Sequence, residues 1–274
     1  MDARTRGSVR SVCHSYEGVS RVTSSKKKPV VVLPGFLNTS ASYKNLAEKL
    51  EVLGYYCEIL QVNNVDWGRV TAGGDFRFYV DRLETAVKRL SDSYGECCSL
   101  IGHSAGGWIP RLLLGDTPYQ GKIYGHADKV DKLITLGTPH HSIEKYPFGR
   151  FDEKIVFDDP MLPSNARVSS LQYANYYYPR GDAFPGVEIV CIAGNAIKGK
   201  PDIFDTKYFF AYQCYKATCG DGYVNGDGVT PVCISHLEGA SANVTLDGVW
   251  HGPIGTPGMP WYGDAIESWI HFLS

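Results

Sequence analysis

The chain has 274 residues, of which 43% are hydrophobic and 20% charged, and its 27 Lys and Arg nearly balance its 29 Asp and Glu. A formal net charge of -2 excludes a globally basic nucleic-acid-binding protein. The longest apolar run is about eight residues, near 30–37, whereas a membrane-spanning helix needs about 20. This length can bury a large core without disulfides or metals, and 30 Gly with 15 Pro disfavour a helical bundle.

Residues 1–28 differ in composition from the rest of the chain. They carry seven basic residues against two acids, are rich in serine, and lack the apolar segment of a secretory signal. This composition is typical of an organelle transit peptide. A flexible N-terminus and a weak basic patch for anionic lipid headgroups, giving peripheral membrane contact, are the alternatives. We expect residues 1–28 to form a basic tail and 29–274 to form one domain.

Hydrophobic patterns predict alternating strands and helices along this domain. Short β-branched runs predict buried strands, and apolar residues at i, i+4 and i+7, as in Phe76, Val80 and Leu83, predict amphipathic helices. A further strand is expected between His236 and His251. The predicted strands are 30–36, 56–62, 98–102, 133–137 and 187–193, and the predicted helices are 43–53, 76–93, 105–114 and 264–273. The fold class is therefore α/β, with a parallel sheet covered by helices on both faces.

Residues 141–186 form an irregular stretch between two predicted strands. It contains Tyr173, Tyr176, Tyr177 and Tyr178. A loop this long inside a compact domain is usually functional, so we predict a lid-like insertion. The alternative is that the tyrosines cover an edge of the sheet.

The eight cysteines do not form the pattern of a disulfide framework. The chain is too long to need one, and no secretory signal accompanies them. Cys57 and Cys191 lie in strand-like runs, where a free thiol behaves as a small hydrophobe. Cys214 and Cys219 are the pair close enough in sequence for a local disulfide or metal pair, but a second Cys/His pair at zinc spacing is missing. We expect a reducing compartment and no metal.

The chemistry is indicated by Gly102-His103-Ser104-Ala105-Gly106, which follows a predicted strand and precedes a predicted helix. This is the G-x-S-x-G nucleophile elbow, in which a strained turn exposes the serine. Small residues two positions away let the turn pack, and the helix N-terminus supports developing negative charge. Ser104 is therefore the candidate nucleophile.

An oxyanion hole needs two backbone N–H donors aimed at one point. The residue after the nucleophile, Ala105, supplies one. The other is expected from the turn after the first strand, where Gly35 permits close approach and Phe36 carries the N–H. A plain Pro-Gly turn is the alternative for this segment.

The base is expected to be a histidine late in the chain, because proteins with this elbow order their triad as Ser, Asp or Glu, then His. The histidines that follow Ser104 are His126, His140, His141, His236, His251 and His271. His251 follows a strand and precedes a Gly- and Pro-rich loop, so we predict that it is the base. The residues predicted to line the pocket and contact substrate are Leu37, His103, Trp108, His140 and Trp250, with His141 beside them. Because adjacent residues in a turn point apart, His103 is not expected to be the base.

The acid must lie between Ser104 and His251 in the chain. Asp227 is flanked by glycines in Gly226-Asp227-Gly228, a turn that could aim a carboxylate inward. Asp202 and Asp205 lie nearer the end of the fifth predicted strand, and Asp221 also competes. We predict that Asp227 is the acid and leave the other three as alternatives.

These motifs resemble the α/β-hydrolase superfamily on its lipase-like side, and more narrowly a group of plant and algal α/β-hydrolases, many of them plastid-directed. The resemblance covers nearly everything after the tail and runs through VVVLPGF at 30–36, GHSAGGW at 102–108, TLGTPH at 135–140, GDGVTPV at 226–232, and HLEGA with LDGVWH at 236–251. It implies the α/β-hydrolase fold, Ser104 as nucleophile, Asp227 as acid and His251 as base. It also implies a plastid location, with the cytoplasm as the alternative. Pro110 departs from the pattern and should kink the elbow helix.

The sequence therefore predicts a serine hydrolase of carboxylic esters, with an acyl-lipid-like substrate. A thioesterase or acyltransferase would use the same residues, and a non-catalytic ligand-binding protein could use the same fold. No cofactor and no nucleic acid are expected. We expect a monomer whose partner is a small-molecule or lipid ester.

Overall fold

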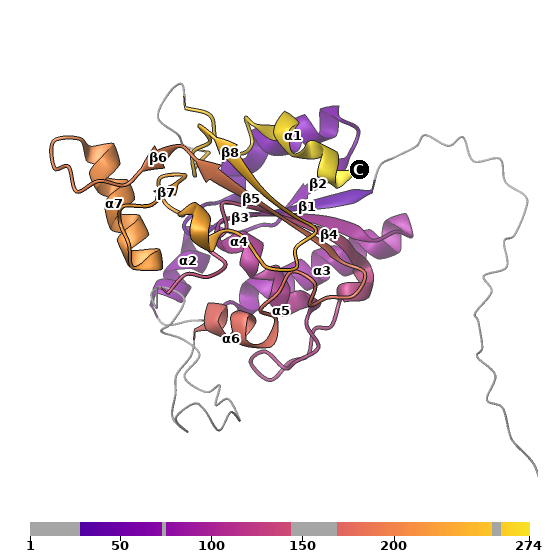
Figure 1. Ribbon diagram of the computed structural model, residues 1–274. Coiled ribbons are helices and arrows are strands. Elements are labelled where there is room, and N and C mark those ends of the chain that lie inside the picture. Colours follow the sequence, from indigo (N-terminus) through magenta and orange to yellow (C-terminus); the bar gives the residue numbers. More distant parts are fainter. Residues whose placement is uncertain (1–27, 73–74, 144–168, 254–258) are drawn as a thin grey trace, which may run out of the picture.

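A six-stranded parallel sheet forms the centre of the structure (Figure 1). The computed structural model describes residues 28–72, 75–143, 169–253 and 259–274. The strands, in their order across the sheet, are β2 (Tyr56–Ile59), β1 (Pro29–Leu33), β3 (Cys98–His103), β4 (Val130–Leu136), β5 (Glu188–Asn195) and β8 (Ala242–Asp247). A short antiparallel pair, β6 (Ile197–Lys198) and β7 (Asn225–Gly226), follows β5. The predicted parallel α/β sheet is confirmed.

Helices cover both faces of this sheet (Figure 1). Side chains alternate along a strand, so Val31 and Leu33 of β1 enter one core while Val30 and Val32 enter the other. The first core is covered by α2 (Asn64–Thr71), α3 (Arg77–Tyr94), α4 (Ala105–Trp108), α5 (Pro110–Leu114) and α6 (Ser170–Tyr177). The second is covered by η1 (Ser40–Tyr43), α1 (Lys44–Val52), η4 (Ile266–Ser268) and η5 (Ile270–Leu273). The remaining elements are η2 (Ala127–Lys129), α7 (Thr206–Cys219) and η3 (Val232–Ile234). None of the helices described here is long and apolar enough to cross a membrane.

The helix after the elbow is interrupted where the sequence predicts a kink. Helix α4 ends at Trp108, and α5 begins at Pro110. Proline lacks an N–H, so it is tolerated as the first residue of a new helix but not in the interior of a longer one.

The predicted C-terminal helix over 264–273 is wrong. The segment forms two 3₁₀ turns, η4 and η5, which meet at Trp269, whose φ of -136° lies outside the helical region. The indole of Trp269 donates a hydrogen bond to the carbonyl oxygen of Tyr262 at 2.9 Å. The same apolar residues, Ile266, Trp269 and Leu273, are nevertheless buried against the sheet. Tertiary packing of the large indole therefore overrides the local helical pattern.

The stretch 141–186 is partly ordered into helix α6, while residues 144–168 lie outside the described residues. Tyr173 and Tyr178 are buried in the core, and Tyr176 and Tyr177 are exposed. The Tyr173 hydroxyl donates to the carbonyl oxygen of Pro118 at 2.8 Å. Two of the four tyrosines are therefore core residues, and the lid over the remaining segment stays a prediction.

Trp269→Ala should destabilise the protein by about 3–5 kcal/mol, because it removes a buried aromatic side chain and leaves a cavity over the sheet. Glu267→Ala, on the exposed side of the same turns, should change the free energy of unfolding by less than about 0.5 kcal/mol. Urea unfolding of the two variants measures both values. Equal effects would contradict the packing described for the C-terminus.

Candidate active site

The elbow places Ser104 between β3 and α4 in a strained conformation. Its φ of 52° and ψ of -125° are rare for a residue with a side chain. A Cβ added at Gly102 would lie 2.3 Å from the carbonyl oxygen of Gly106, and one at Gly106 would lie 2.4 Å from that of Leu33. The two glycines of the motif are therefore required by direct backbone contact. The Ser104 N–H donates to the carbonyl oxygen of Leu136 at 2.9 Å, which fixes the turn on β4.

The Asp227 carboxylate is fully buried and accepts four hydrogen bonds. Its Oδ1 accepts the backbone N–H groups of Val229 at 3.0 Å and Thr230 at 2.7 Å. Its Oδ2 accepts Nδ1–H of His251 at 2.8 Å and the hydroxyl of Tyr262 at 2.7 Å. A carboxylate that is hydrogen-bonded at both oxygens can remain charged when buried.

The competing aspartates lie in local turns. Asp202, Asp205 and Asp221 each accept a hydrogen bond from the backbone N–H two residues later. Within the described ranges, no hydrogen bond or ion pair joins any of the three to a histidine. The structure thus brings Asp227 to His251 and leaves the other three at the surface or at a helix cap.

His251 is held by both its backbone and its ring. Its N–H donates to the carbonyl oxygen of Asp227 at 2.9 Å, and its Nδ1–H donates to the carboxylate. This tautomer leaves the Nε2 lone pair available to take a proton. Ser104 and His251 are not joined by a hydrogen bond in this structure, and such a bond often tightens only in the complex with substrate.

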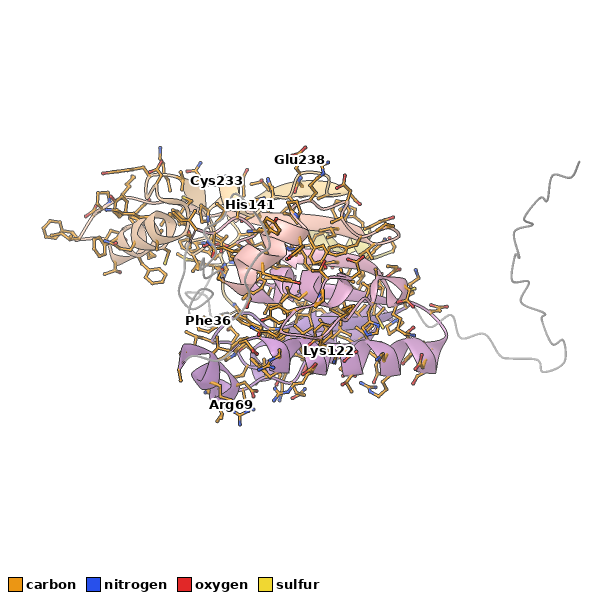
Figure 2. The ribbon with its side chains drawn as sticks, turned by 90° about the horizontal axis from the view of Figure 1, so that it is seen from below. Phe36, Arg69, Lys122, His141, Cys233 and Glu238 are labelled. Atoms are coloured by element: carbon orange, nitrogen blue, oxygen red, sulfur yellow. The ribbon has the colours of Figure 1, made fainter. Side chains whose placement is uncertain are left out.

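The predicted oxyanion residues flank Ser104. Ala105 is the first residue of α4, where backbone N–H groups lack an intrahelical acceptor. A Cβ added at Gly35 would lie 2.8 Å from Cβ of Ser104, so glycine lets the loop after β1 reach the serine. Phe36 follows in this loop, and its ring packs edge-on against Trp67 at 5.4 Å (Phe36 is labelled in Figure 2). The oxyanion role of the two N–H groups stays a prediction.

Two residues predicted to contact substrate are buried in this structure. Trp108 and His140 are each fully buried. The Trp108 ring packs edge-on against Phe76 at 5.2 Å, and His140 Nε2 lies 3.1 Å from Oγ1 of Thr135. The described residues cover both side chains, and their predicted contact with substrate stays a prediction. From the elbow and from the end of β4, their side chains point into the core.

Leu37, Trp250 and His141 remain partly or fully exposed. Leu37 is 64% exposed and has a φ of 62°, which turns the loop after β1 outward. Trp250 is half-buried and packs against Ile197 and Tyr215, next to the turn that carries Asp227. Leu37 and Trp250 therefore lie at the edge of the candidate site, and their predicted contact with substrate stays a prediction.

His103 is buried and hydrogen-bonded at both ring nitrogens. Its Nε2–H donates to the carbonyl oxygen of His251 at 2.7 Å. The hydroxyl of Tyr43 donates to its Nδ1 at 2.7 Å and accepts the N–H of Gly35 at 2.9 Å. Burial first, and then the nearby His251 ring, hold the pKa of His103 well below its usual range. The neutral ring therefore links the loop after β1 to the backbone of the candidate base, and its predicted contact with substrate stays a prediction.

Two tyrosines that sequence reasoning missed complete the site. The Tyr43 hydroxyl accepts Gly35 N–H and donates to His103, whereas the Tyr262 hydroxyl accepts Gly194 N–H at 2.7 Å and donates to Asp227. Both hydroxyls are buried, so they have fixed partners. No motif or spacing marks either residue, because each meets its partner through the fold.

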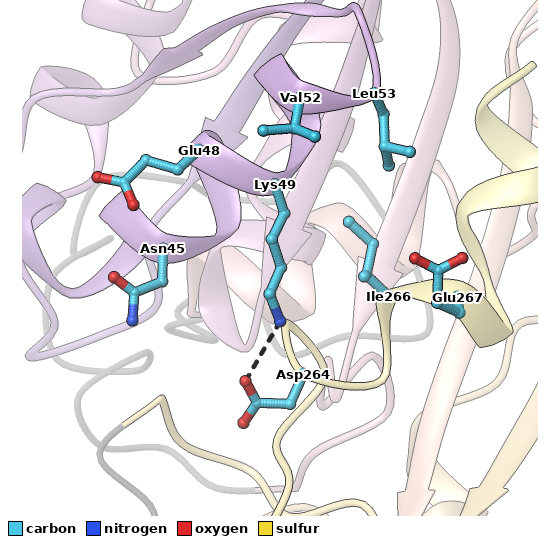
Figure 3. A pocket seen from close by; sticks show the side chains of 8 residues that line it. All are labelled: Asn45, Glu48, Lys49, Val52, Leu53, Asp264, Ile266 and Glu267. Carbon is cyan, nitrogen blue, oxygen red and sulfur yellow. Dashed lines mark hydrogen bonds and ion pairs between the residues drawn. The ribbon is translucent and has the colours of Figure 1, made fainter.

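Neither a metal centre nor a surface hollow marks the candidate site among the residues that the structure describes. No group of three or more His, Cys, Asp or Glu side chains in the described ranges could hold a metal ion. A surface hollow of about 600 Å³ lies between α1 and η4, where Lys49 pairs with Asp264 at 3.4 Å (Figure 3). Its lining includes none of the candidate active-site residues.

Comparison with known proteins identifies the fold. The sequence matches no protein-family model and no curated protein. The mature form of Bacillus licheniformis lipase BlEst2 superposes with a TM-score of 0.59 at 15% identity, covering 94% of this chain and 96% of that chain. Its propeptide form gives a TM-score of 0.60 at 16% identity, covering 94% of this chain and 52% of that chain. Phospholipase PlaB of Legionella pneumophila gives a TM-score of 0.51 at 14% identity, and the match covers 90% of this chain and 59% of that chain.

The protein therefore has the α/β-hydrolase fold. The similarity in structure extends over nearly the whole of the mature lipase, whereas the chain spans about half the length of the propeptide form. These similarities give no support to the narrower resemblance to plant and algal hydrolases or to a plastid location.

Asp227→Asn should lower kcat for a short-chain p-nitrophenyl ester by about 10² to 10⁴. The amide would present a donor to His251 Nδ1 and favour the wrong imidazole tautomer. Asn at Asp202, Asp205 or Asp221 should change kcat less than about threefold, since each caps only a local turn. Steady-state kinetics of the four variants side by side measures this. If Asp227→Asn kept near-wild-type kcat while another variant collapsed, the acid would be misassigned.

Tyr43→Phe should lower kcat by roughly 5- to 50-fold with little change in KM, because the loop after β1 and His103 lose a shared fixed partner. Tyr173→Phe is the matched control, since its buried hydroxyl bonds Pro118 outside the site. Both variants should lose about 1–3 kcal/mol of stability. Kinetics and urea unfolding separate the two effects, and an equal fall in kcat for both would reject a positioning role for Tyr43.

Proposed function

We propose that the protein is a serine hydrolase that cleaves carboxylic esters, with Ser104 as nucleophile, His251 as base and Asp227 as the acid of the triad. The observation that carries this proposal is the buried Asp227–His251 pair at 2.8 Å, set beside a serine on a strained strand-to-helix turn. A carboxylate, an imidazole and a partly exposed serine hydroxyl in this arrangement are the groups that nucleophilic acyl transfer requires.

The reaction follows from the tautomer that Asp227 imposes. His251 Nε2 takes the proton of Ser104 Oγ as that oxygen attacks the ester carbonyl, and the charge of Asp227 stabilises the resulting imidazolium. The backbone N–H groups of Ala105 and Phe36 stabilise the tetrahedral oxyanion. His251 then returns the proton to the departing alcohol, and a water activated by the same base releases the acid from Ser104.

An apolar acyl group is the substrate class that we propose. Leu37 exposes 64% of its surface in the loop beside Ser104, and the half-buried Trp250 adds apolar surface next to the acid. Such side chains favour apolar ligand groups. The fold is shared with proteins named as a lipase and a phospholipase, which supports an acyl lipid as the ester.

Ser104→Ala should abolish hydrolysis of short-chain esters, with a loss of about 10⁶ in kcat. A fluorophosphonate probe should label the wild-type protein on Ser104 and fail to label this variant. Ser93→Ala, an exposed serine on α3, is the matched control and should keep both activity and labelling.

Two results would contradict the proposal. One is that purified Ser104→Ala keeps more than a few per cent of the activity. The other is that the probe labels a different residue of an active wild-type protein.

A further inference from the structure

One oxygen of the Asp227 carboxylate accepts hydrogen bonds from two different side chains. Its Oδ2 accepts Nδ1–H of His251 at 2.8 Å and the hydroxyl of Tyr262 at 2.7 Å, whereas Oδ1 accepts two backbone N–H groups of its own turn. The imidazole and the phenol therefore share one acceptor. Each of these donors stabilises negative charge on Oδ2, so the strength of one bond depends on the presence of the other.

The backbone on either side holds Tyr262 beside the candidate base. The carbonyl oxygen of Tyr262 accepts the indole N–H of Trp269 at 2.9 Å. Two residues earlier, the carbonyl oxygen of Pro260 accepts the N–H of Trp250, the residue before His251, at 2.9 Å. The segments that carry the phenol and the imidazole are thus joined to each other, and both side chains reach Oδ2 from fixed positions.

The direction of the bond from Tyr262 to the carboxylate is also fixed. The hydroxyl oxygen accepts the N–H of Gly194 at 2.7 Å, so its own hydrogen is directed to Oδ2 of Asp227. A Cβ added at Gly137, which follows β4, would lie 2.6 Å from this hydroxyl and 2.6 Å from Oδ2. Burial first, and then the Asp227 charge, raise the pKa of Tyr262 well above its usual range, so the hydroxyl keeps its proton.

We propose that Tyr262 is a positioning residue that weakens the hold of Asp227 on the protonated imidazole, and that it thereby sets the pH range in which His251 acts as the base. The negative charge on Oδ2 stabilises the imidazolium. The Tyr262 hydroxyl draws part of this charge to itself, so the ring gives up its proton more readily. This inference rests on the proposed function, in which the neutral ring of His251 takes the proton of Ser104.

Other titratable side chains that face the Asp227–His251 pair stay neutral. The ring of His103, on β3, lies 4.8 Å from the His251 ring, with the Tyr43 hydroxyl behind it, and Tyr215 of α7 lies under the turn of Asp227. Burial holds the pKa of His103 well below its usual range and raises the pKa of each tyrosine above its own. None of the three is expected to change charge between about pH 6 and pH 9. A change in the pH profile therefore reports on the pair itself.

Tyr262→Phe removes the hydroxyl and keeps the ring. The pH at which kcat/KM for a short-chain p-nitrophenyl ester reaches half of its plateau should rise by about 0.5–1 unit, because Asp227 then holds the imidazolium more tightly. Tyr215→Phe is the matched control. Its buried hydroxyl also accepts one backbone N–H, from Gly228 at 2.8 Å, but donates to the carbonyl oxygen of Ile197 at 3.2 Å. This control should keep the half-plateau pH of the wild type.

A second readout needs no substrate. NMR of protein labelled with ¹⁵N-histidine detects the proton on Nδ1 of His251, and Asp227→Asn identifies its resonance by removing the carboxylate acceptor. The resonance should move to lower field in Tyr262→Phe, because a hydrogen bond to a more negative acceptor is stronger. It should stay in place in Tyr215→Phe.

A purely structural role for Tyr262 gives a different result. Activity would then fall by the same factor at every pH, and either an unchanged half-plateau pH or an unmoved resonance would overturn the inference. A half-plateau pH that fell in Tyr262→Phe would overturn it as well. Activity kept by Ser104→Ala would instead refute the proposed function, and the resonance, which needs no activity, tells the two failures apart.

Discussion

The buried carboxylate of Asp227 is the interaction on which the site depends. Burying a charged carboxylate away from solvent costs free energy unless both of its oxygens accept hydrogen bonds. Here four donors from three separate parts of the chain supply these bonds. Two backbone N–H groups come from its own turn, the hydroxyl comes from Tyr262, and the imidazole comes from His251. Removing any one donor would leave a buried negative charge partly unsatisfied. The carboxylate therefore fixes the turn, the C-terminal segment and the imidazole at the same time.

A second network fixes the other half of the site without any charge. Tyr43 connects the loop after β1 to His103, and His103 connects the elbow to the backbone of His251. Tyr43 and Tyr262 both belong to the core on the α1 face of the sheet. The position of the candidate base is therefore set by packing on that face, while Trp108 supports the elbow from the opposite core. Preorganisation of this kind allows charge to develop in a transition state without rearrangement of the protein.

Sequence patterns predicted those features that depend on local chemistry. The β-branched run at Val30–Val32 could only be a buried strand, and the glycines of the elbow are dictated by backbone contacts within a few residues. Features set by long-range packing were missed. Helix α7 has apolar and aromatic residues on all sides, so no helical period marked it. The side chains of His140 and Trp108 point into the core because of tertiary packing. The hydrogen bonds of Tyr43 and Tyr262 likewise join segments that are far apart in the sequence.

The central claim is that Ser104 carries an acyl group during turnover, and rapid mixing with a p-nitrophenyl ester tests it most directly. The account predicts a burst of nitrophenol close to one equivalent per active site whenever deacylation is the slower step. Acid quenching during the burst, followed by peptide mapping, should find the acyl group on Ser104. Turnover of a slowly deacylated ester with no acyl adduct, or with the adduct on another residue, would contradict the account.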